Sequence, residues 1–351
     1  MTTYISLESD FTELISKKYH STNILSSELP DTKILEISDE FFASASNLLK
    51  PTAPIQKPNF FTEQGAWYDG WETRRHNPAG FDYLIIQSGV QSGANIVGCE
   101  VDTTFFTGNN GEFFEVEGTF VENYDDKIDD FNKLEWDVVV EKTQLKPSQR
   151  HFFLNTLGLT EKKYNLFKFK MFPDGGISRF RLYGRVNIES KYETSTSENE
   201  DWAYMLNGGI VTSASNQHYS SPSNLLLPGR GVNMGDGWET KRSRVPGHVD
   251  WVIVKLGKPV TFIDTVIVDT ANFKGNFPNY FEVYAIFSEI RDDDQLSEND
   301  SSWVKIVEKT KGKPHFEHVL KIDYKSDIKF THVKLVTIPD GGVKRLRVIG
   351  H

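Results

Sequence analysis

The chain has 351 residues, enough for two domains of typical size or one large β domain, so a disulfide-stapled mini-scaffold is excluded. With 39 Lys and Arg against 49 Asp and Glu, the net charge of −10 opposes contact with a phosphate backbone, and no nucleic-acid partner is expected. The single cysteine, Cys99, excludes an internal disulfide and a zinc site of several cysteines. A buried position in a strand is its expected role, and a catalytic thiol is the alternative.

The first segment in chain order, residues 1–22, is interpreted as an N-terminal extension that belongs to neither of the two repeats that follow. It holds the clearest short helical pattern of the chain, from Phe11 to Lys18. It lacks the basic and apolar regions of a secretory signal, and no stretch of the sequence approaches the ~20 apolar residues that span a bilayer. We therefore expect no membrane partner and a cytoplasmic location.

Two copies of one sequence pattern make up the rest of the chain. Trp71-Glu72-Thr73-Arg74-Arg75 recurs 167 residues later as Trp238-Glu239-Thr240-Lys241-Arg242, and Pro173-Asp174-Gly175-Gly176 recurs as Pro339-Asp340-Gly341-Gly342. Upstream, Ser44-Ala45-Ser46-Asn47 is matched with Ser213-Ala214-Ser215-Asn216. A period of this length is too long for a solenoid unit, so each copy is interpreted as a domain. The predicted domains are residues 23–186 and 202–351, and the polar segment 187–201 is the predicted linker.

Within each copy the apolar residues follow the period of β-strands. Residues 250–256 and 265–268 are short runs rich in β-branched side chains, bounded by Gly, Pro or Asp. A long alternation of strands and helices is absent, which disfavours a parallel sheet. We predict an all-β protein of two tandem homologous antiparallel β-sandwiches.

The closing strand of each copy presents two arginines on one face. Alternation places Arg179 and Arg181 on one side of the strand, and it does the same for Arg345 and Arg347 in the second copy. A pair of guanidinium groups on a rigid strand can hold a substrate carboxylate bidentately. Pairing with Asp or Glu of a neighbouring strand is the equally weighted alternative.

The Trp-Glu-Thr motif concentrates acids and bases in a loop, where binding residues of sandwiches usually lie. Its glutamates, Glu72 and Glu239, are candidates for a general base, and its arginines can bind an acid group. Asn109 and Asn276 each follow a glycine downstream, where they form either a turn or contacts to an amide-like ligand. The Pro-Asp-Gly-Gly motif is interpreted mainly as a turn.

The nine histidines show no metal-binding spacing, and the sequence lacks nucleotide-binding and acyl-serine motifs. No cofactor is predicted, and a divalent metal held by residues from distant segments is left open.

These motifs together resemble the allantoicase family. The resemblance rests on Asp-Gly-Trp-Glu-Thr-Arg/Lys-Arg, Pro-Gly-His before a Trp-bearing strand, Asp-Thr-x-x-Phe-x-Gly-Asn and Pro-Asp-Gly-Gly-x-x-Arg-x-Arg, in order and twice, over about residues 41–350. It implies two jelly-roll copies of the galactose-binding or discoidin-like type. It also implies hydrolysis of allantoate to ureidoglycolate and urea in purine degradation.

On this resemblance, Glu72 or Glu239 is the expected general base and His248 the expected general acid. The expected substrate-binding residues are Arg74, Arg75, Arg242, Asn109, Asn276, Arg179, Arg181, Arg345 and Arg347. The histidine of Pro-Gly-His occurs only in the second copy, and Gly111 stands where that copy has Pro278. Either one copy is catalytic and the other supports it, or one composite site uses both.

A non-enzymatic pair of sandwiches that binds a small ligand or a carbohydrate is the alternative function, since fold does not fix function. A scaffold protein does not explain the duplicated acid–base loops. The expected partner is a small molecule, allantoate, and a homo-oligomer is expected from the symmetry preference of soluble proteins.

Overall fold

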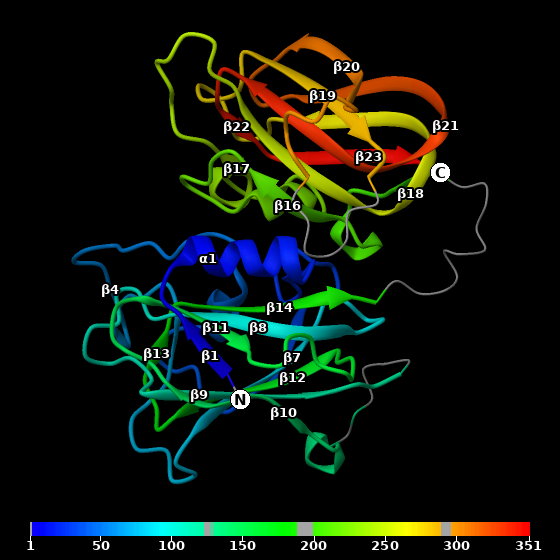
Figure 1. The fold of residues 1–351 in the computed structure, drawn as a ribbon. Helices are drawn as coiled ribbons and strands as arrows, with labels where there is room; N and C mark the ends of the chain where they lie inside the picture. Colours follow the sequence, from blue (N-terminus) through cyan, green and yellow to red (C-terminus); the bar gives the residue numbers. More distant parts are fainter. Residues whose placement is uncertain (1, 123–127, 129, 188–198, 289–295) are drawn as a thin grey trace. The chain divides into compact units, whose positions relative to one another are not determined.

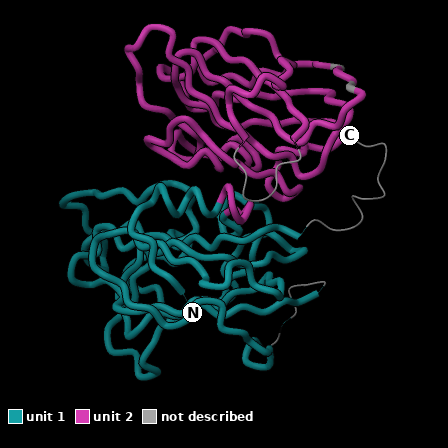
Figure 2. The backbone as a smooth tube through the Cα atoms, in the orientation of Figure 1, with its two compact units in different colours: residues 1–15, 23–187 teal, residues 16–22, 188–351 magenta. Residues whose placement is uncertain are grey.

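The computed structural model describes residues 2–122, 128, 130–187, 199–288 and 296–351. Two compact units divide the chain: residues 1–15 with 23–187, and residues 16–22 with 188–351 (Figure 2). Each unit holds one of the two sequence repeats.

Unit 1 is built on two five-stranded sheets, in the orders β1-β11-β8-β14-β2 and β10-β9-β12-β7-β3 (Figure 1). The first sheet contains β1 (Thr2–Ile5), β2 (Thr22–Asn23), β8 (Ala94–Asp102), β11 (Arg150–Asn155) and β14 (Arg179–Val186). The second contains β3 (Lys33–Ile37), β7 (Asp82–Gln87), β9 (Phe113–Thr119), β10 (Asp137–Gln144) and β12 (Leu166–Phe172). A short hairpin joins β4 (Phe61–Thr62) to β5 (Gly65–Ala66), and β6 (Trp71–Glu72) pairs with the distant β13 (Gly176–Ile177) in a separate two-stranded sheet.

Short helical segments complete unit 1. They are the α-helix α1 (Glu8–Glu13) and the 3₁₀ turns η2 (Ala45–Leu49) and η3 (Phe131–Lys133), while the π-helical turn η1 (Leu14–Lys18) begins in unit 1 and continues into the residues that group with unit 2. The helical prediction for residues 11–18 is therefore confirmed.

The core of unit 1 lies between its two sheets. Buried and partly exposed residues alternate along β9 and β14, as expected for strands with one face on the core. Across the core, the rings of Phe169 in β12 and Phe180 in β14 lie 4.5 Å apart. Burial of such side chains contributes about 1.5–3 kcal/mol each to folding.

Unit 2 differs because two strands run through both layers of its sandwich. Its elements are η4 (Met205–Asn207), η5 (Pro222–Leu226), η6 (Met234–Asp236), β15 (Glu200–Asp201), β16 (Ile210–Ala214), β17 (Trp238–Glu239), β18 (Asp250–Asp269), β19 (Tyr280–Ile286), β20 (Val304–Lys311), β21 (Glu317–Ile338), β22 (Gly342–Val343) and β23 (Arg345–Gly350). β18 pairs along its whole length with β21, with irregular register between Lys255 and Thr265. The first part of β18 also pairs with β16, and its last part pairs with β23.

The corresponding strands of unit 1 are interrupted by glycines in the left-handed region. Gly93, at φ +88°, precedes β8, and Gly158, at φ +82°, lies between β11 and β12. Such φ values are accessible to glycine and end an extended run. The prediction of separate strands at 250–256 and 265–268 is wrong, because both are parts of one strand, β18. The all-β class of two antiparallel repeat domains is confirmed.

The structure describes only part of the predicted linker. Residues 188–198 of the predicted linker lie outside the described residues. Its last two residues form β15, which pairs with β23. In the predicted extension, β1 pairs with β11 of unit 1, whereas residues 16–22 group with unit 2.

The upstream match of Ser44–Asn47 with Ser213–Asn216 is wrong. Residues 213–216 lie at the end of β16, whereas Asn47 lies in η2 and donates its side-chain amide to Gly70 O at 3.0 Å. The structural equivalent of Asn47 is Asn224 in η5, which donates to Gly237 O at 3.1 Å. The two asparagines are 177 residues apart rather than 167, because the first repeat has ten more residues than the second between this turn and the Trp-Glu-Thr motif.

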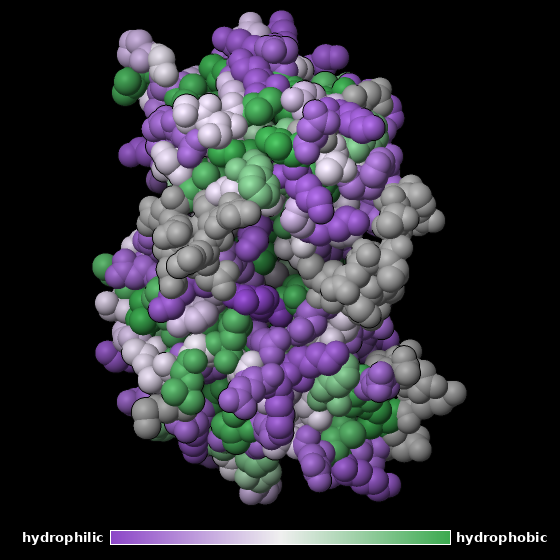
Figure 3. All heavy atoms as spheres, turned by 45° about the vertical axis from the view of Figure 1, so that its right-hand side comes forward, coloured by the Kyte–Doolittle hydropathy of each residue, from purple (hydrophilic) through white to green (hydrophobic). Residues whose placement is uncertain are grey.

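Charged and polar side chains cover much of the face shown in Figure 3, among scattered apolar ones. No helix among the described residues is long and apolar enough to cross a membrane.

We expect Cys99 to be inert in the folded protein. The side chain is fully buried in β8, and burial, followed by the charge of Glu100, raises the pKa of its thiol far above the usual range. An Ellman's-reagent assay at pH 8 should show no reaction in native protein and one thiol per chain after unfolding in guanidinium. Rapid reaction in the native state would contradict the buried position.

Candidate functional site

In each repeat, the Trp-Glu-Thr motif pairs with the Pro-Asp-Gly-Gly motif in a short two-stranded antiparallel sheet. Glu72 lies opposite Gly176 in the β6–β13 pair, and Glu239 lies opposite Gly342 in the β17–β22 pair. The preceding tryptophans are fully buried and anchor these two-stranded sheets, since their Nε1 atoms donate to the Asp39 and Asn216 carbonyls. The two glutamates are therefore fixed at equivalent places.

Each of these glutamates is held by the asparagine of the Gly-Asn turn. Asn109 Nδ2 donates to Glu72 Oε1 at 2.7 Å, and Asn276 Nδ2 donates to Glu239 Oε1 at 2.6 Å. Burial raises the pKa of the Glu72 carboxyl, while the hydrogen bond from Asn109 and the charge of Arg75 act against that rise. The sequence thus placed both asparagines in the candidate site, and the structure brings them into contact with the candidate bases.

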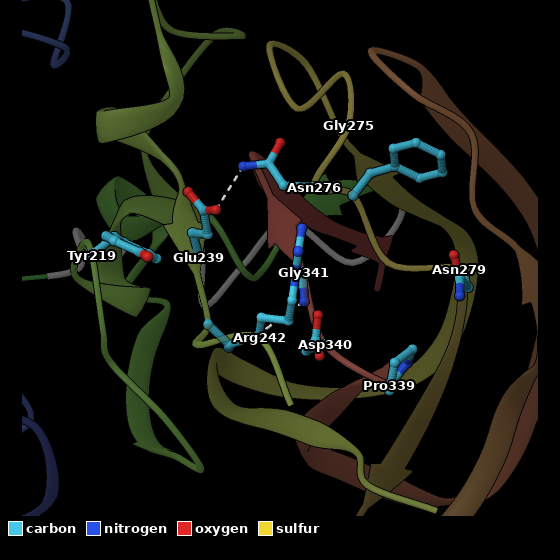
Figure 4. Close-up of a pocket in the computed structure, with 11 residues that line it drawn as sticks. Tyr219, Glu239, Arg242, Gly275, Asn276, Asn279, Pro339, Asp340 and Gly341 are labelled. Atoms are coloured by element: carbon cyan, nitrogen blue, oxygen red, sulfur yellow. Dashed lines mark hydrogen bonds between the residues drawn. The ribbon is translucent and has the colours of Figure 1, made fainter. Parts of the chain in front are cut away.

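A pocket of about 280 Å³ opens beside Glu239 in the second repeat. Figure 4 shows Glu239 and Asn276 joined by their hydrogen bond, with Tyr219 on one side and Asn279 on the other. The lining residues are Tyr219, Glu239, Thr240, Arg242, Gly275, Asn276, Phe277, Asn279, Pro339, Asp340 and Gly341. The pocket therefore combines two carboxylates, one guanidinium group and two amides.

The loop that carries Arg242 is tied to the Pro-Asp-Gly-Gly turn. Asp340 Oδ2 accepts a hydrogen bond from Ser243 N at 2.7 Å, and Thr240 Oγ1 accepts one from Gly341 N at 3.1 Å. Gly341 adopts φ +132°, and a Cβ atom there would lie 2.7 Å from the Phe277 carbonyl carbon. Glycine is thus required for this turn to reach the Gly-Asn turn.

Replacing Gly342 by alanine should destabilise the protein by about 1–3 kcal/mol, because the site of a new Cβ is already occupied. That atom would lie 2.0 Å from the Phe273 ring. Gly275→Ala is the matched control, since a Cβ at Gly275 meets nothing within 4 Å. Denaturant unfolding of both variants measures the difference, and equal stability would contradict this packing.

The allantoicase repeat matches residues 23–187 and 200–351. Allantoicase from Saccharomyces cerevisiae is 46% identical over 344 residues, which cover 98% of each chain. Allantoicase from Neurospora crassa is 45% identical over 95% of this chain and 93% of that protein.

The chain belongs to the allantoicase family. The crystal structure of the Saccharomyces cerevisiae allantoicase superposes with a TM-score of 0.81 at 43% identity, covering 100% of both chains. The tandem-repeat organisation inferred from the motifs is thus a property of the allantoicase family.

The four arginines of the closing strands have partners outside the pocket of this allantoicase-family chain. Arg179 is fully buried and donates to Asp69 Oδ2 at 2.6 Å, and Arg181 donates to Glu100 Oε1 at 3.0 Å. In the second repeat Arg345 donates to the Asp236 carbonyl, and Arg347 lies 3.5 Å from Asp201. Neither Arg345 nor Arg347 lines the pocket. Arg181 and Arg347 pair with carboxylates of the neighbouring strands β8 and β15, the alternative that the sequence left open, whereas Arg179 contacts a loop and Arg345 contacts η6.

Two further predicted residues also contact other groups. His248 Nε2 lies 3.2 Å from Asp250 Oδ2, and His248 is not among the pocket-lining residues. Arg74 donates from Nε and Nη2 to Asp39 Oδ1, at 3.0 and 2.7 Å. Arg242, in contrast, lines the pocket, as does its neighbour Thr240.

Sequence reasoning missed Tyr219 and Asn279. When Asn47 is matched with Asn224, Tyr219 becomes the equivalent of Phe42, which lies three residues before η2 begins at Ala45. Asn279 follows the Gly-Asn turn by three residues, and only the folded turn brings it to the pocket. A repeat alignment that allows for the ten additional residues of the first repeat would have matched Tyr219 with Phe42.

Metal-binding residues were left open by the sequence. In the parts of the chain that the structure describes, no group of three or more His, Cys, Asp or Glu side chains is arranged to hold a metal ion.

Proposed function

We propose that this chain hydrolyses allantoate to ureidoglycolate and urea, and that the pocket of the second repeat holds the substrate. The observation that carries the activity is its 46% identity to an allantoicase over 98% of both chains. The placement of the site is supported by Glu239, Asn276 and Arg242, which line one pocket.

The pocket offers a partner for each part of allantoate. The substrate has one carboxylate, which suits the exposed guanidinium group of Arg242. It also has two ureido arms with N–H donors and carbonyl acceptors. The carboxylate of Asp340 can accept from the arms, and the amide of Asn279 can both donate and accept.

The reaction replaces a carbon–nitrogen bond by a carbon–oxygen bond at the central carbon. Water supplies the oxygen and loses a proton, and the departing ureido nitrogen gains a proton and leaves as urea. In the proposal, Glu239 takes the proton from water and returns it to the leaving nitrogen. Asn276 Nδ2 donates to Oε1 of Glu239, which fixes the orientation of the carboxylate. In the proposal, Oε2 is the atom that contacts the substrate.

No step is assigned to His248. Its imidazole lies against Asp250, which also accepts a hydrogen bond from Ser215 Oγ at 2.7 Å. A role for His248 as general acid stays a prediction, as do the homo-oligomeric state and the cytoplasmic location.

Incubating the purified protein with allantoate tests the activity directly. A urease-coupled assay should detect one urea for each allantoate consumed, with ureidoglycolate as the second product. The alternative function predicts no urea release together with saturable binding of a sugar. That result would overturn the proposal.

A further inference from the structure

The first repeat contains a second carboxylate–amide pair that the proposed reaction does not use. Glu72 and Asn109 have nearly the same hydrogen-bond length as their equivalents, 2.7 Å against 2.6 Å. Gly176 N donates to the Asn109 carbonyl at 2.7 Å, the distance also found for Gly342 N and the Asn276 carbonyl. The backbone around the two pairs is therefore held alike.

A compensating change in packing preserves the turn that carries Asn109. A Cβ atom at Gly111 would lie 2.6 Å from Cγ of Met171, which is fully buried. In the second repeat the turn has Pro278, and the residue equivalent to Met171 is the smaller Thr337. The first repeat thus packs a small turn residue against a large strand residue, and the second repeat packs a large turn residue against a small strand residue. The space between turn and strand stays filled, so the turn keeps its conformation with glycine.

The rims of the two sites differ in charge. Asp39 stands where the second repeat has Asn216, since each accepts from a tryptophan Nε1 through its carbonyl, at 2.7 and 2.9 Å. Glu112 stands where the second repeat has Asn279, since their carbonyls accept from the equivalent residues Leu145 N and Gly312 N, at 2.8 and 2.9 Å. The first site therefore has two more carboxylates at its rim.

Of these two carboxylates, Asp39 acts by neutralising one cation of the first site. Arg74 is held by Asp39 through two hydrogen bonds to Oδ1 and a third from its backbone N to Oδ2 at 2.6 Å. Lys241, at the same place in the second repeat, donates its backbone N to the neutral Asn216 instead. An anionic ligand is consequently disfavoured at the first site relative to the second.

We propose that the Glu72–Asn109 pair is a second ligand site, selective for a neutral urea-type group. The Glu72 carboxylate accepts the N–H donors of such a group. The net charge around the pair is more negative than around Glu239, which disfavours a ligand that bears its own carboxylate. The choice of ligand class rests on the proposed function, because urea is the neutral product that the reaction releases. The two repeats then divide the chemistry, with the anionic ureide in the second and the neutral one in the first.

Two probes separate the sites by charge: methylurea, which is neutral, and N-carbamoylglycine, which carries a ureido group and a carboxylate. We would titrate each into ¹⁵N-labelled full-length protein and follow the side-chain amide signals of Asn109 and Asn276, assigned with Asn109→Asp and Asn276→Asp variants. At Asn109, methylurea should bind about tenfold or more tightly than N-carbamoylglycine, and at Asn276 the order should reverse.

The double variant Asp39→Asn, Glu112→Asn converts the rim of the first site to that of the second. Asn at position 39 retains an oxygen for the Arg74 backbone, as Asn216 does for Lys241, so the loop should keep its fold. Its preference for methylurea at Asn109 should fall by roughly tenfold, because two carboxylates are removed.

Unmoved Asn109 signals with both probes at tens of millimolar would overturn the proposal, as would equal preferences at the two asparagines in the wild-type chain. Neither result depends on turnover. Failure of the wild-type chain to release urea from allantoate would instead overturn the proposed function and leave the titrations interpretable.

Discussion

Glu239→Gln should lower kcat for urea release from allantoate by about 10²–10⁴-fold, the range that general acid–base groups contribute. The glutamine carbonyl can still accept the hydrogen bond from Asn276, so the fold and the pocket should persist while the proton acceptor is lost. Initial rates from the urease-coupled assay, together with thermal unfolding of the variant, measure both effects.

The first repeat supplies a matched comparison for this variant. Glu72→Gln changes the equivalent carboxylate, with the equivalent bond to Asn109. Its loss of kcat should be at least tenfold smaller than that of Glu239→Gln. If the two losses were reversed in size, the catalytic centre would lie in the first repeat.

Arg242→Ala should lower kcat/KM for allantoate by about 10–100-fold, mainly through a higher KM. The guanidinium group lines the pocket, and a charge-assisted hydrogen bond to a carboxylate is worth about 1.5–3 kcal/mol. Arg242→Lys should recover part of the loss, since it keeps the charge without the bidentate geometry. Steady-state kinetics of both variants test this assignment.

Arg244→Ala is the control for Arg242. Arg244 is exposed, two residues along the same loop, and is not among the residues that line the pocket. Its removal should change KM by less than about twofold, as for surface charges in general. An equal effect of both variants would indicate a general electrostatic attraction rather than a contact from Arg242.

The duplicated motifs and the period of the apolar residues were sufficient to predict two antiparallel sandwiches. They also selected Glu239, Asn276 and Arg242, which the fold brings to one pocket. The contact of Glu239 with Asn276 was beyond sequence reasoning, because Glu239 ends β17 and Asn276 lies in the turn before β19, and the two meet only when the β17–β22 pair and this turn have formed.

The arginines of the closing strands show why alternation has limits. It states which side chains share a face, but not what covers that face. In the first repeat the face is covered by the segment before the Trp-Glu-Thr motif, where Asp69 and the Thr52 carbonyl accept from Arg179. The pairing follows from loop conformation, for which neither spacing nor propensity provides a signal.

Tyr219 shows a second limit. A constant offset between the repeats aligned the wrong upstream residues, because extra residues in the first repeat change the spacing there. Loops tolerate such insertions at little energetic cost, so a register established at one motif does not extend across them.

The uninterrupted strands β18 and β21 have a consequence for how the second repeat opens. β18 and β21 pair from Asp250 to Asp269, through both sheets of the sandwich. Separating the two strands in one sheet therefore disturbs their hydrogen bonds in the other. We expect amide hydrogen exchange in residues 250–255 and 265–269 to occur in a single opening event. The equivalent strands of the first repeat, β7 and β8, are separate elements and should exchange with distinct protection.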